Sequence, residues 1–536
     1  MQYITAPKLK EIVKGEFEFA LLDVRERDPY SKAHILLSTC VPLGQLELSL
    51  SDLLPRLSTK IVLISDDPKS TNGLSEMACM RLQNLGYTDV SILEGGISAW
   101  QGAGFEMFSG NGSYSKAFGE WIAEQYDTPF ITPEELQSKK SNDERQTILD
   151  SRPKGEYHRM TIPGSINAPG AELAYRVHDT ARNASEMVVV NCAGRTRSII
   201  GAQSLVNSGI PNPVAALRNG TMGWQLAGFE LEYGQTRSAP PPSPEGLSKA
   251  RECATGVAKR FGVRKISYET LKQWMSARGE RTTYVFDVRL PEEFAAGHFE
   301  GSRNAQGGQL VQASDEYISV FNARLVLIDD TEVRAIMTAS WMIQMGWPET
   351  YVLEGGIGNL PLTKALYKPS VLGFKKADSI TTGELQELLE NSGDQVAILD
   401  VAAGAYYKGQ HIAGAWWGIR SRLLTDSSKL PTVRTLVLTS EDGILAHFAA
   451  KDLENIRSTA KILVLEGGTK AWIDSGNATA AGMERPISAE DDAWYMPYMH
   501  PDAPVELKMA YFEWEYGLVG QIERDGTAKF RKFPKN

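Results

Sequence analysis

The sequence repeats one pattern of apolar strands and turns four times along its 536 residues. Each copy begins with an apolar strand that ends in an aspartate, at Asp23, Asp150, Asp287 and Asp400. A polar stretch, a turn and three further strands follow, with a helical segment between the last two. The spacing between copies, roughly 110–140 residues, is much longer than a solenoid unit, so each copy is expected to fold as a domain.

Short apolar strands that alternate with helical segments predict a parallel α/β sheet with helices on both faces. A Pro-rich spacer near residue 240 and helical stretches between copies indicate the boundaries. The predicted division is repeat 1 (1–108), a linker helix (109–128), repeat 2 (129–236), a Pro-rich linker and helix (237–263), repeat 3 (264–364), repeat 4 (375–478) and a C-terminal tail (479–536). Residues 509–518 of the tail are expected to form an amphipathic helix that packs back on the domains.

Composition excludes several classes of function. The formal net charge of -10 argues against a nucleic-acid partner, which would need a basic surface. No apolar run approaches the ~18 residues of a membrane span, and the first residues lack the pattern of a secretory signal. We therefore expect a cytoplasmic protein with no membrane partner.

The cysteines and histidines do not form a metal-binding or disulfide pattern. Cys40, Cys79, Cys192 and Cys253 are widely spaced, without a CxxC pair. The seven histidines include no HExxH motif. The sequence predicts no metal site and no cofactor.

Cys192 directly follows an apolar strand and begins a glycine-containing, basic loop. The loop reads Cys192-Ala193-Gly194-Arg195-Thr196-Arg197-Ser198. Backbone N–H groups of such a loop can surround an anion, and a helix that begins near its end adds a positive dipole. The two arginines add formal charge. The sequence therefore predicts a thiol of lowered pKa that acts as a nucleophile.

The other three copies place no thiol at this position. It is occupied by Ser65 in repeat 1, Asp329 in repeat 3 and Ser440 in repeat 4. The loops that follow, 65–70, 329–334 and 440–445, are acidic where the loop of repeat 2 is basic. We therefore expect these copies to be catalytically inactive and to serve as scaffold, to shape the Cys192 cleft or to dock a partner.

These motifs together resemble the rhodanese (thiosulfate sulfurtransferase) superfamily. They are an Asp-x-Arg after the first strand of three copies, a Gly-His-x-x-Gly-Ser turn at 297–302, the Cys192 loop and a Gly-Gly-x-x-x-Trp ending. The resemblance covers all four copies. It implies four tandem rhodanese-like domains, each a mostly parallel five-stranded sheet flanked by helices, with the active loop at the carboxyl end of a strand.

The resemblance also implies a two-step reaction. The Cys192 thiolate would attack the outer sulfur of thiosulfate or a similar small anionic donor and become a persulfide. A thiol, cyanide or a protein would then accept that sulfur. The guanidinium groups of Arg195 and Arg197 have the geometry to bind sulfonate oxygens through paired hydrogen bonds. The predicted substrate-binding residues of the loop are Ala193, Gly194, Arg195, Thr196, Arg197 and Ser198.

Further candidates lie outside the loop. Arg159 and Arg176 are predicted to bind the anionic donor at the mouth of the pocket. Arg218 stands where the other copies have glutamate, which would suit an anionic substrate. Asp150 and Arg152 are expected to support the site through a structural ion pair, and a pair between Glu156 and Arg152 is also predicted.

Two alternatives stay open at this stage. The chain could be a persulfide carrier or sensor whose inactive copies bind partners. It could also be a phosphatase or arsenate reductase of the same fold, but those carry a Cys-x5-Arg loop, whereas Cys192 and Arg197 form Cys-x4-Arg. Mercaptopyruvate is disfavoured as donor, because relatives that use it tend toward a Gly-Ser-Gly-Val-Thr loop. The physiological donor and acceptor and the oligomeric state are left open.

Overall fold

The structure is a computed structural model that describes all residues except 67–72, 143, 359, 455, 457–458 and 535–536. The elements of repeat 1 are β1 (Gln2–Ile4), α1 (Ala6–Lys14), β2 (Phe19–Asp23), α2 (Arg27–Lys32), β3 (Thr39–Cys40), α3 (Leu46–Leu53), β4 (Lys60–Ile64), α4 (Leu74–Asn84), β5 (Asp89–Leu93) and α5 (Gly96–Gly102). The helix α6 (Ser113–Tyr126) follows.

Repeat 2 has the same succession of elements. They are β6 (Phe130–Ile131), α7 (Pro133–Ser141), β7 (Gln146–Asp150), α8 (Lys154–Arg159), β8 (Ile166–Asn167), α9 (Glu172–Thr180), β9 (Met187–Asn191), α10 (Thr196–Ser208), β10 (Val214–Leu217) and α11 (Gly220–Leu226). The helix α12 (Pro244–Phe261) leads to the next repeat.

Repeats 3 and 4 follow the scheme with small additions. Repeat 3 has β11 (Arg264–Ile266), α13 (Tyr268–Ser276), β12 (Thr283–Asp287), α14 (Pro291–Ala296), β13 (His298–Phe299), β14 (Arg303–Asn304), α15 (Gly307–Gln312), α16 (Ser314–Tyr317), β15 (Val320–Phe321), β16 (Arg324–Ile328), α17 (Val333–Gln344), β17 (Thr350–Leu353) and β18 (Leu362–Thr363). Repeat 4 has β19 (Ser379–Ile380), α18 (Thr382–Ser392), β20 (Val396–Asp400), α19 (Gly404–Gly409), β21 (His411–Ile412), β22 (Trp416–Trp417), α20 (Leu423–Asp426), β23 (Thr435–Thr439), α21 (Ile444–Leu453), β24 (Lys461–Leu465), α22 (Gly468–Asp474) and β25 (Thr479–Ala480). The tail contains α23 (Val505–Asp525).

Each repeat builds a parallel sheet with the same strand order. In repeat 2 the order is β6-β10-β9-β7-β8, and the corresponding strands of repeats 1, 3 and 4 are arranged in the same way. All neighbouring strands of this order run parallel. The predicted α/β class, with a mostly parallel sheet in each repeat, is confirmed.

The central strands are apolar on both faces because helices cover both. In β9, Val188, Val189 and Val190 are all fully buried. A continuous apolar run of this kind is typical of a parallel sheet between two helical layers. The strand can therefore deliver whatever residue follows it to the carboxyl edge of the sheet.

The sheet of repeat 1 has a sixth strand, which the sequence did not predict. The short strand β15 of repeat 3 pairs antiparallel with β2, with Val320 opposite Ala20 and Phe321 opposite Phe19. The rings of Phe19 and Phe321 stack at 5.3 Å. Since β3 pairs only with the end of β2, the first half of β2 has free backbone groups that β15 satisfies. Repeats 1 and 3 are thus joined by backbone pairing.

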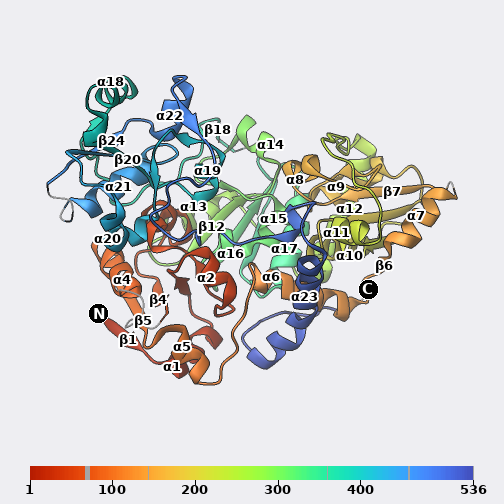
Figure 1. Ribbon diagram of the computed structural model, residues 1–536. Coiled ribbons are helices and arrows are strands. Elements are labelled where there is room, and N and C mark those ends of the chain that lie inside the picture. Colours follow the sequence, from red (N-terminus) through yellow and green to blue (C-terminus); the bar gives the residue numbers. More distant parts are fainter. Residues whose placement is uncertain (67–72, 143, 359, 455, 457–458, 535–536) are drawn as a thin grey trace.

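Repeat 3 lies at the centre of the molecule, in green, with repeat 2 on one side and repeats 1 and 4 on the other (Figure 1). Repeats 1, 2 and 3 and the tail share one continuous apolar core, in which Leu63, Leu205, Leu327 and Leu518 are fully buried. Repeat 4 has its own core clusters. The tail helix α23 packs along α6, next to α10 of repeat 2 (Figure 1). This brings the tail to the carboxyl edge of the repeat 2 sheet.

Candidate active site

Cys192 lies directly after β9, the central strand of its sheet, and α10 begins four residues later. Sites in open α/β sheets occupy this edge. The Cys192 side chain is 2% exposed. Its carbonyl accepts a 2.8 Å hydrogen bond from the backbone of Thr221, at the start of α11. The loop is thus held between two helix N-termini.

The glycine that ends the closing turn of the repeat, Gly220 in repeat 2, explains this close packing. Gly220 has a φ of +57°, and a Cβ at this position would lie 2.3 Å from the Cys192 carbonyl oxygen. Only glycine permits both the backbone conformation and the approach. A Cβ added to the equivalent glycine of each other repeat would likewise lie 2.2–2.3 Å from the corresponding carbonyl oxygen: Gly96 at Ser65, Gly356 at Asp329 and Gly468 at Ser440. The motif therefore belongs to the frame of every repeat.

The surroundings of Cys192 do not lower the pKa of its thiol. Burial raises its pKa, and this outweighs the lowering by Arg197, by the Ser198 hydroxyl and by the backbone N–H groups of Ser198 and Gly194. The thiol donates a 3.4 Å hydrogen bond to Ser198 Oγ. Of the predicted loop N–H groups, those of Ser198 and Gly194 face the sulfur. The expected net lowering of the pKa was wrong, because the sequence did not reveal how completely the loop is covered.

Both arginines of the loop are already engaged by carboxylates. Arg195 donates to Glu120 on α6, at 2.7 and 2.6 Å. Arg197 donates to Glu156 on α8, at 2.7 and 2.8 Å. The predicted pair between Glu156 and Arg152 is therefore not formed. Since both guanidinium groups are buried and paired, neither is free to bind an anion, although Arg197 still lowers the pKa of the Cys192 thiol.

Repeat 3 contains the same arginine without the cysteine. Arg334 follows Asp329 by the same five positions that separate Arg197 from Cys192. It donates to Glu293 at 2.7 Å, as Arg197 donates to Glu156. The arginine–glutamate pair is thus retained where no thiol exists. We conclude that this pair belongs to the frame, whereas the sequence predicted Arg197 only as a substrate-binding residue.

Asp150 and Arg152 form a buried ion pair beneath the loop. Arg152 Nε donates to Asp150 Oδ1 at 2.9 Å, and its Nη2 donates to the Met160 carbonyl at 2.6 Å. Asp150 also accepts hydrogen bonds from Thr161 and Asn191. The same pair occurs in repeats 1 and 3, between Asp23 and Arg25 and between Asp287 and Arg289. It therefore fixes the strand end in these copies.

The remaining predicted arginines do not converge on the thiol. Arg176 donates to Glu172 and to the Ala239 carbonyl, on the side of the repeat that faces repeat 3. Arg218 is exposed and lies over the ring of Phe130. Arg159 is exposed and contacts Met499 Sδ at 3.6 Å. Of the three, only Arg159 reaches toward the space in front of the loop.

The tail supplies residues that sequence reasoning missed. The ring of Tyr511 on α23 would lie 3.4 Å from a Cβ at Gly194, and Glu515 Oε2 would lie 3.7 Å from it. Tyr511 donates a 2.9 Å hydrogen bond to Glu515 Oε1. Burial and the neighbouring Glu120 raise the pKa of Glu515 to about 7, against the lowering by Lys116, Tyr511 and Arg195. The tail helix is therefore the cover that removes the loop from water.

The thiol position of the other repeats is occupied as the sequence indicates. Ser65 Oγ accepts a hydrogen bond from Ser75, and Ser440 Oγ accepts one from the backbone of Ala446. Burial raises the pKa of Asp329 to about 6, despite Arg334. Of the repeat 1 loop, residues 67–70 lie outside the described residues.

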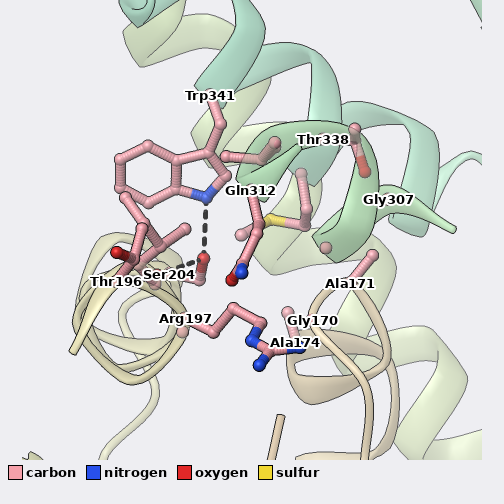
Figure 2. A pocket seen from close by; sticks show the side chains of 15 residues that line it. Gly170, Ala171, Ala174, Thr196, Arg197, Ser204, Gly307, Gln312, Thr338 and Trp341 are labelled. Carbon is pink, nitrogen blue, oxygen red and sulfur yellow. Dashed lines mark hydrogen bonds between the residues drawn. The ribbon is translucent and has the colours of Figure 1, made fainter. Parts of the chain in front are cut away.

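Two cavities border on Arg197. The smaller one, between repeats 2 and 3, has a volume of about 30 Å³. Figure 2 shows Arg197 extending toward Gly170 in this gap, below Trp341, whose Nε1 donates to Ser204 Oγ at 2.8 Å. The gap is large enough for water only. The larger cavity, of about 350 Å³, opens in front of Arg197, Glu156 and Tyr498.

Among the described residues, no group of three or more histidine, cysteine or acidic side chains could hold a metal ion. All four cysteines are free thiols. No helix in the described part of the chain is long and apolar enough to cross a membrane.

The family is decided by comparison with known proteins. The protein-family model of the rhodanese-like domain matches residues 5–103, 132–227 and 267–360 of the sequence. The chain belongs to the rhodanese family. The predicted resemblance is thus confirmed. Repeat 4, which that model does not match, has the same strand order as the rhodanese repeats before it.

One of the solved structures is similar to this rhodanese over the full length of both chains. A thiosulfate sulfurtransferase from Pseudomonas aeruginosa is 42% identical, with a TM-score of 0.96 over 100% of both chains. A rhodanese-related protein from Thermoplasma volcanium is 21% identical over 20% of this chain and 100% of its own, with a TM-score of 0.18. The Alr3790 protein from Anabaena sp. is 29% identical over 20% of this chain and 81% of its own, also with a TM-score of 0.18. A comparison with curated proteins found no match.

Proposed function

We propose that the chain is a sulfurtransferase with a single active site, at Cys192, and that thiosulfate or a similar anionic compound is its donor. The full-length similarity to a thiosulfate sulfurtransferase supports this proposal. The observation that carries it is the place of Cys192, a cysteine at the carboxyl end of a central strand inside a loop of N–H groups.

The reaction proceeds in two steps at one sulfur atom. The Cys192 thiolate attacks the outer sulfur of the donor, the S–S bond of the donor breaks, and sulfite leaves with the electron pair. The persulfide then lies where the backbone groups of Gly194 and Ser198 face the sulfur. An acceptor nucleophile attacks the outer sulfur, and Cys192 leaves as thiolate. No net proton or electron is consumed.

Repeats 1, 3 and 4 take no part in this chemistry in our proposal. Their nucleophile positions hold Ser65, Asp329 and Ser440, none of which can form a persulfide. Their role is to support and enclose repeat 2, with which repeats 1 and 3 share a core. The repeat limits given from the sequence stand as our proposed domain boundaries. Four widely spaced free thiols suit a reducing compartment, and we propose the cytoplasm.

The test is the release of thiocyanate from thiosulfate and cyanide by the purified protein. We expect multiple turnovers that are lost in Cys192→Ser and kept in Cys253→Ser, a control at a thiol outside the loop. One persulfide per chain without turnover would support a carrier instead. Turnover of an aryl phosphate with no thiocyanate would contradict both.

A further inference from the structure

The larger cavity is built by five parts of the chain. It has a volume of about 350 Å³. Repeat 1 and α6 contribute Arg27 and Lys116, repeat 2 contributes Arg197, repeat 3 contributes Gln309, and the tail contributes Trp494. Arg197 is also a residue of the Cys192 loop, so the cavity borders on that loop.

Lys116 is a buried cation without an acidic partner. Its side chain is 4% exposed, and Nζ donates to the Asn111 carbonyl and lies 5.6 Å from the centre of the Trp514 ring. No carboxylate oxygen of the described residues lies within 4.0 Å of it. Burial lowers its pKa, because the charged form is poorly compensated. A buried cation of this kind is costly unless an anion joins it.

A second cation lies at the same cavity. Arg27 is exposed, lies over the Trp494 ring at 5.4 Å, and has no ion pair among the described side chains. Acidic groups face the region as well. Glu156 is paired with Arg197, while Glu316, Asp315 and Glu515 lie farther from the two cations than an ion pair requires. The cavity therefore retains two cationic groups that can bind an anion.

The volume and the walls indicate an organic ligand. Cavities of about 300–1,000 Å³ are typical of sites for organic molecules, whereas a bare inorganic ion needs far less. The tail wall presents the apolar side chains of Trp494, Met496 and Met499. Thioether and aromatic groups make favourable contacts with a ligand that contains sulfur.

We propose that this cavity binds the sulfur acceptor, and that the acceptor is an organic thiol with a carboxylate that Lys116 and Arg27 bind. The inference rests on the proposed sulfurtransferase function. The acceptor thiolate attacks the outer sulfur of the Cys192 persulfide, a new S–S bond forms, and the bond to Cys192 breaks. Cys192 keeps the electron pair as thiolate, and the acceptor leaves as its own persulfide.

The experiment separates the two steps. The full-length protein is first loaded with thiosulfate, the donor is removed, and the Cys192 persulfide is measured by mass spectrometry. Its discharge is then timed with mercaptoacetate and with 2-mercaptoethanol, a neutral thiol of the same carbon number, each corrected for its thiolate fraction. We expect mercaptoacetate to react about tenfold faster or more, as one charge-assisted contact predicts.

Variants test the assignment through this ratio of rates. Lys116→Met is expected to bring the ratio of the mercaptoacetate rate to the 2-mercaptoethanol rate close to one. Lys116→Arg should keep most of the preference for mercaptoacetate, because the positive charge remains. Arg27→Met, at an exposed site, should lower the ratio severalfold. Lys140→Met is the matched control: Lys140 also donates to a backbone carbonyl, of Pro163, and lies 5.5 Å from a tryptophan ring, but outside the cavity. It should keep the wild-type ratio.

The two proposals fail in different ways. The acceptor site is overturned if the wild-type ratio is near one, or if neither Lys116→Met nor Arg27→Met changes it. In either case, normal formation of the Cys192 persulfide would still support the proposed sulfurtransferase. A protein that never forms the persulfide overturns the sulfurtransferase, and the acceptor site with it.

Discussion

Tyr511 donates a 2.9 Å hydrogen bond to Glu515, and this pair on the C-terminal helix lies directly over Gly194 of the Cys192 loop. The second oxygen of Glu515 has no hydrogen-bond partner in the structure. A segment that matches no repeat thus covers the candidate nucleophile. The tail belongs to the site, and its removal would expose the loop to water.

The buried Glu515 carboxyl should make stability depend on pH. Its pKa is raised from 4.5 to about 7, so the folded protein holds this proton more tightly than the unfolded chain. The stabilisation is complete below pH 4.5 and is lost as the pH rises through 7. Glu515→Gln should therefore be more stable than wild type at pH 8, by at most about 3 kcal/mol, and not at pH 4.5. Melting curves at both pH values check this.

Glu506→Gln serves as control for that prediction, since Glu506 is exposed on the same helix. It should change neither curve. If Glu515→Gln is less stable than wild type at pH 8, the ionised carboxylate contributes favourably, and the raised pKa is contradicted.

The reactivity of Cys192 should rise steeply with pH. Burial raises its pKa above 9.0, so only a small fraction is thiolate at neutral pH. The rate of persulfide formation from thiosulfate should increase about tenfold per pH unit between pH 7 and 8.5. The amount of sulfite released at a series of reaction times gives this rate. A rate that is constant over this range would mean that the thiolate is already formed at pH 7.

Removing Arg197 or Arg334 should destabilise the fold in the same way, but only the loss of Arg197 should also slow the reaction. Arg197→Met and Arg334→Met each leave a glutamate without its partner, at a cost of about 3 kcal/mol or more. Only Arg197→Met should also slow persulfide formation, by about tenfold, because it removes the cation that lowers the Cys192 pKa. Chemical denaturation and single-turnover rates measure the two effects. Equal loss of rate in both variants would mean that stability alone is responsible.

Gly220 should tolerate no side chain. Alanine there would place its Cβ 2.3 Å from the Cys192 carbonyl, in addition to the strain of a positive φ. Gly228 also has a positive φ, of +84°, but open space around it. Gly220→Ala should lose roughly 2–4 kcal/mol and most of the activity, while Gly228→Ala should show the backbone strain alone, about 1 kcal/mol. Similar losses in both would refute the close contact.

The sequence predicted the fold well because the repeat is carried by local patterns. Apolar strands, terminal aspartates and glycine turns recur with fixed spacing, so the sheet of each repeat and the place of Cys192 followed from them. The partners of the loop did not follow. Glu120 and Glu515 come from segments 72 and 323 residues away from Cys192, outside the repeat pattern. Their approach depends on how the repeats and the tail pack, which no local periodicity encodes.

The same reason explains the error about the thiol. A basic loop at a helix N-terminus predicts a low pKa only if water or an unpaired cation remains beside it. Here Glu156 neutralises Arg197 and Tyr511 covers Gly194, so burial prevails. The strand β15 was unexpected for a similar reason, since it pairs with a strand from another repeat.

The most direct test of the account is the mass of the Cys192 peptide after the protein is mixed with thiosulfate. We predict one added sulfur atom on Cys192, released by cyanide, and none on Cys40, Cys79 or Cys253. An unmodified Cys192 under conditions where the protein produces thiocyanate, or the added sulfur on another cysteine, would contradict the central claim that this loop carries the sulfur.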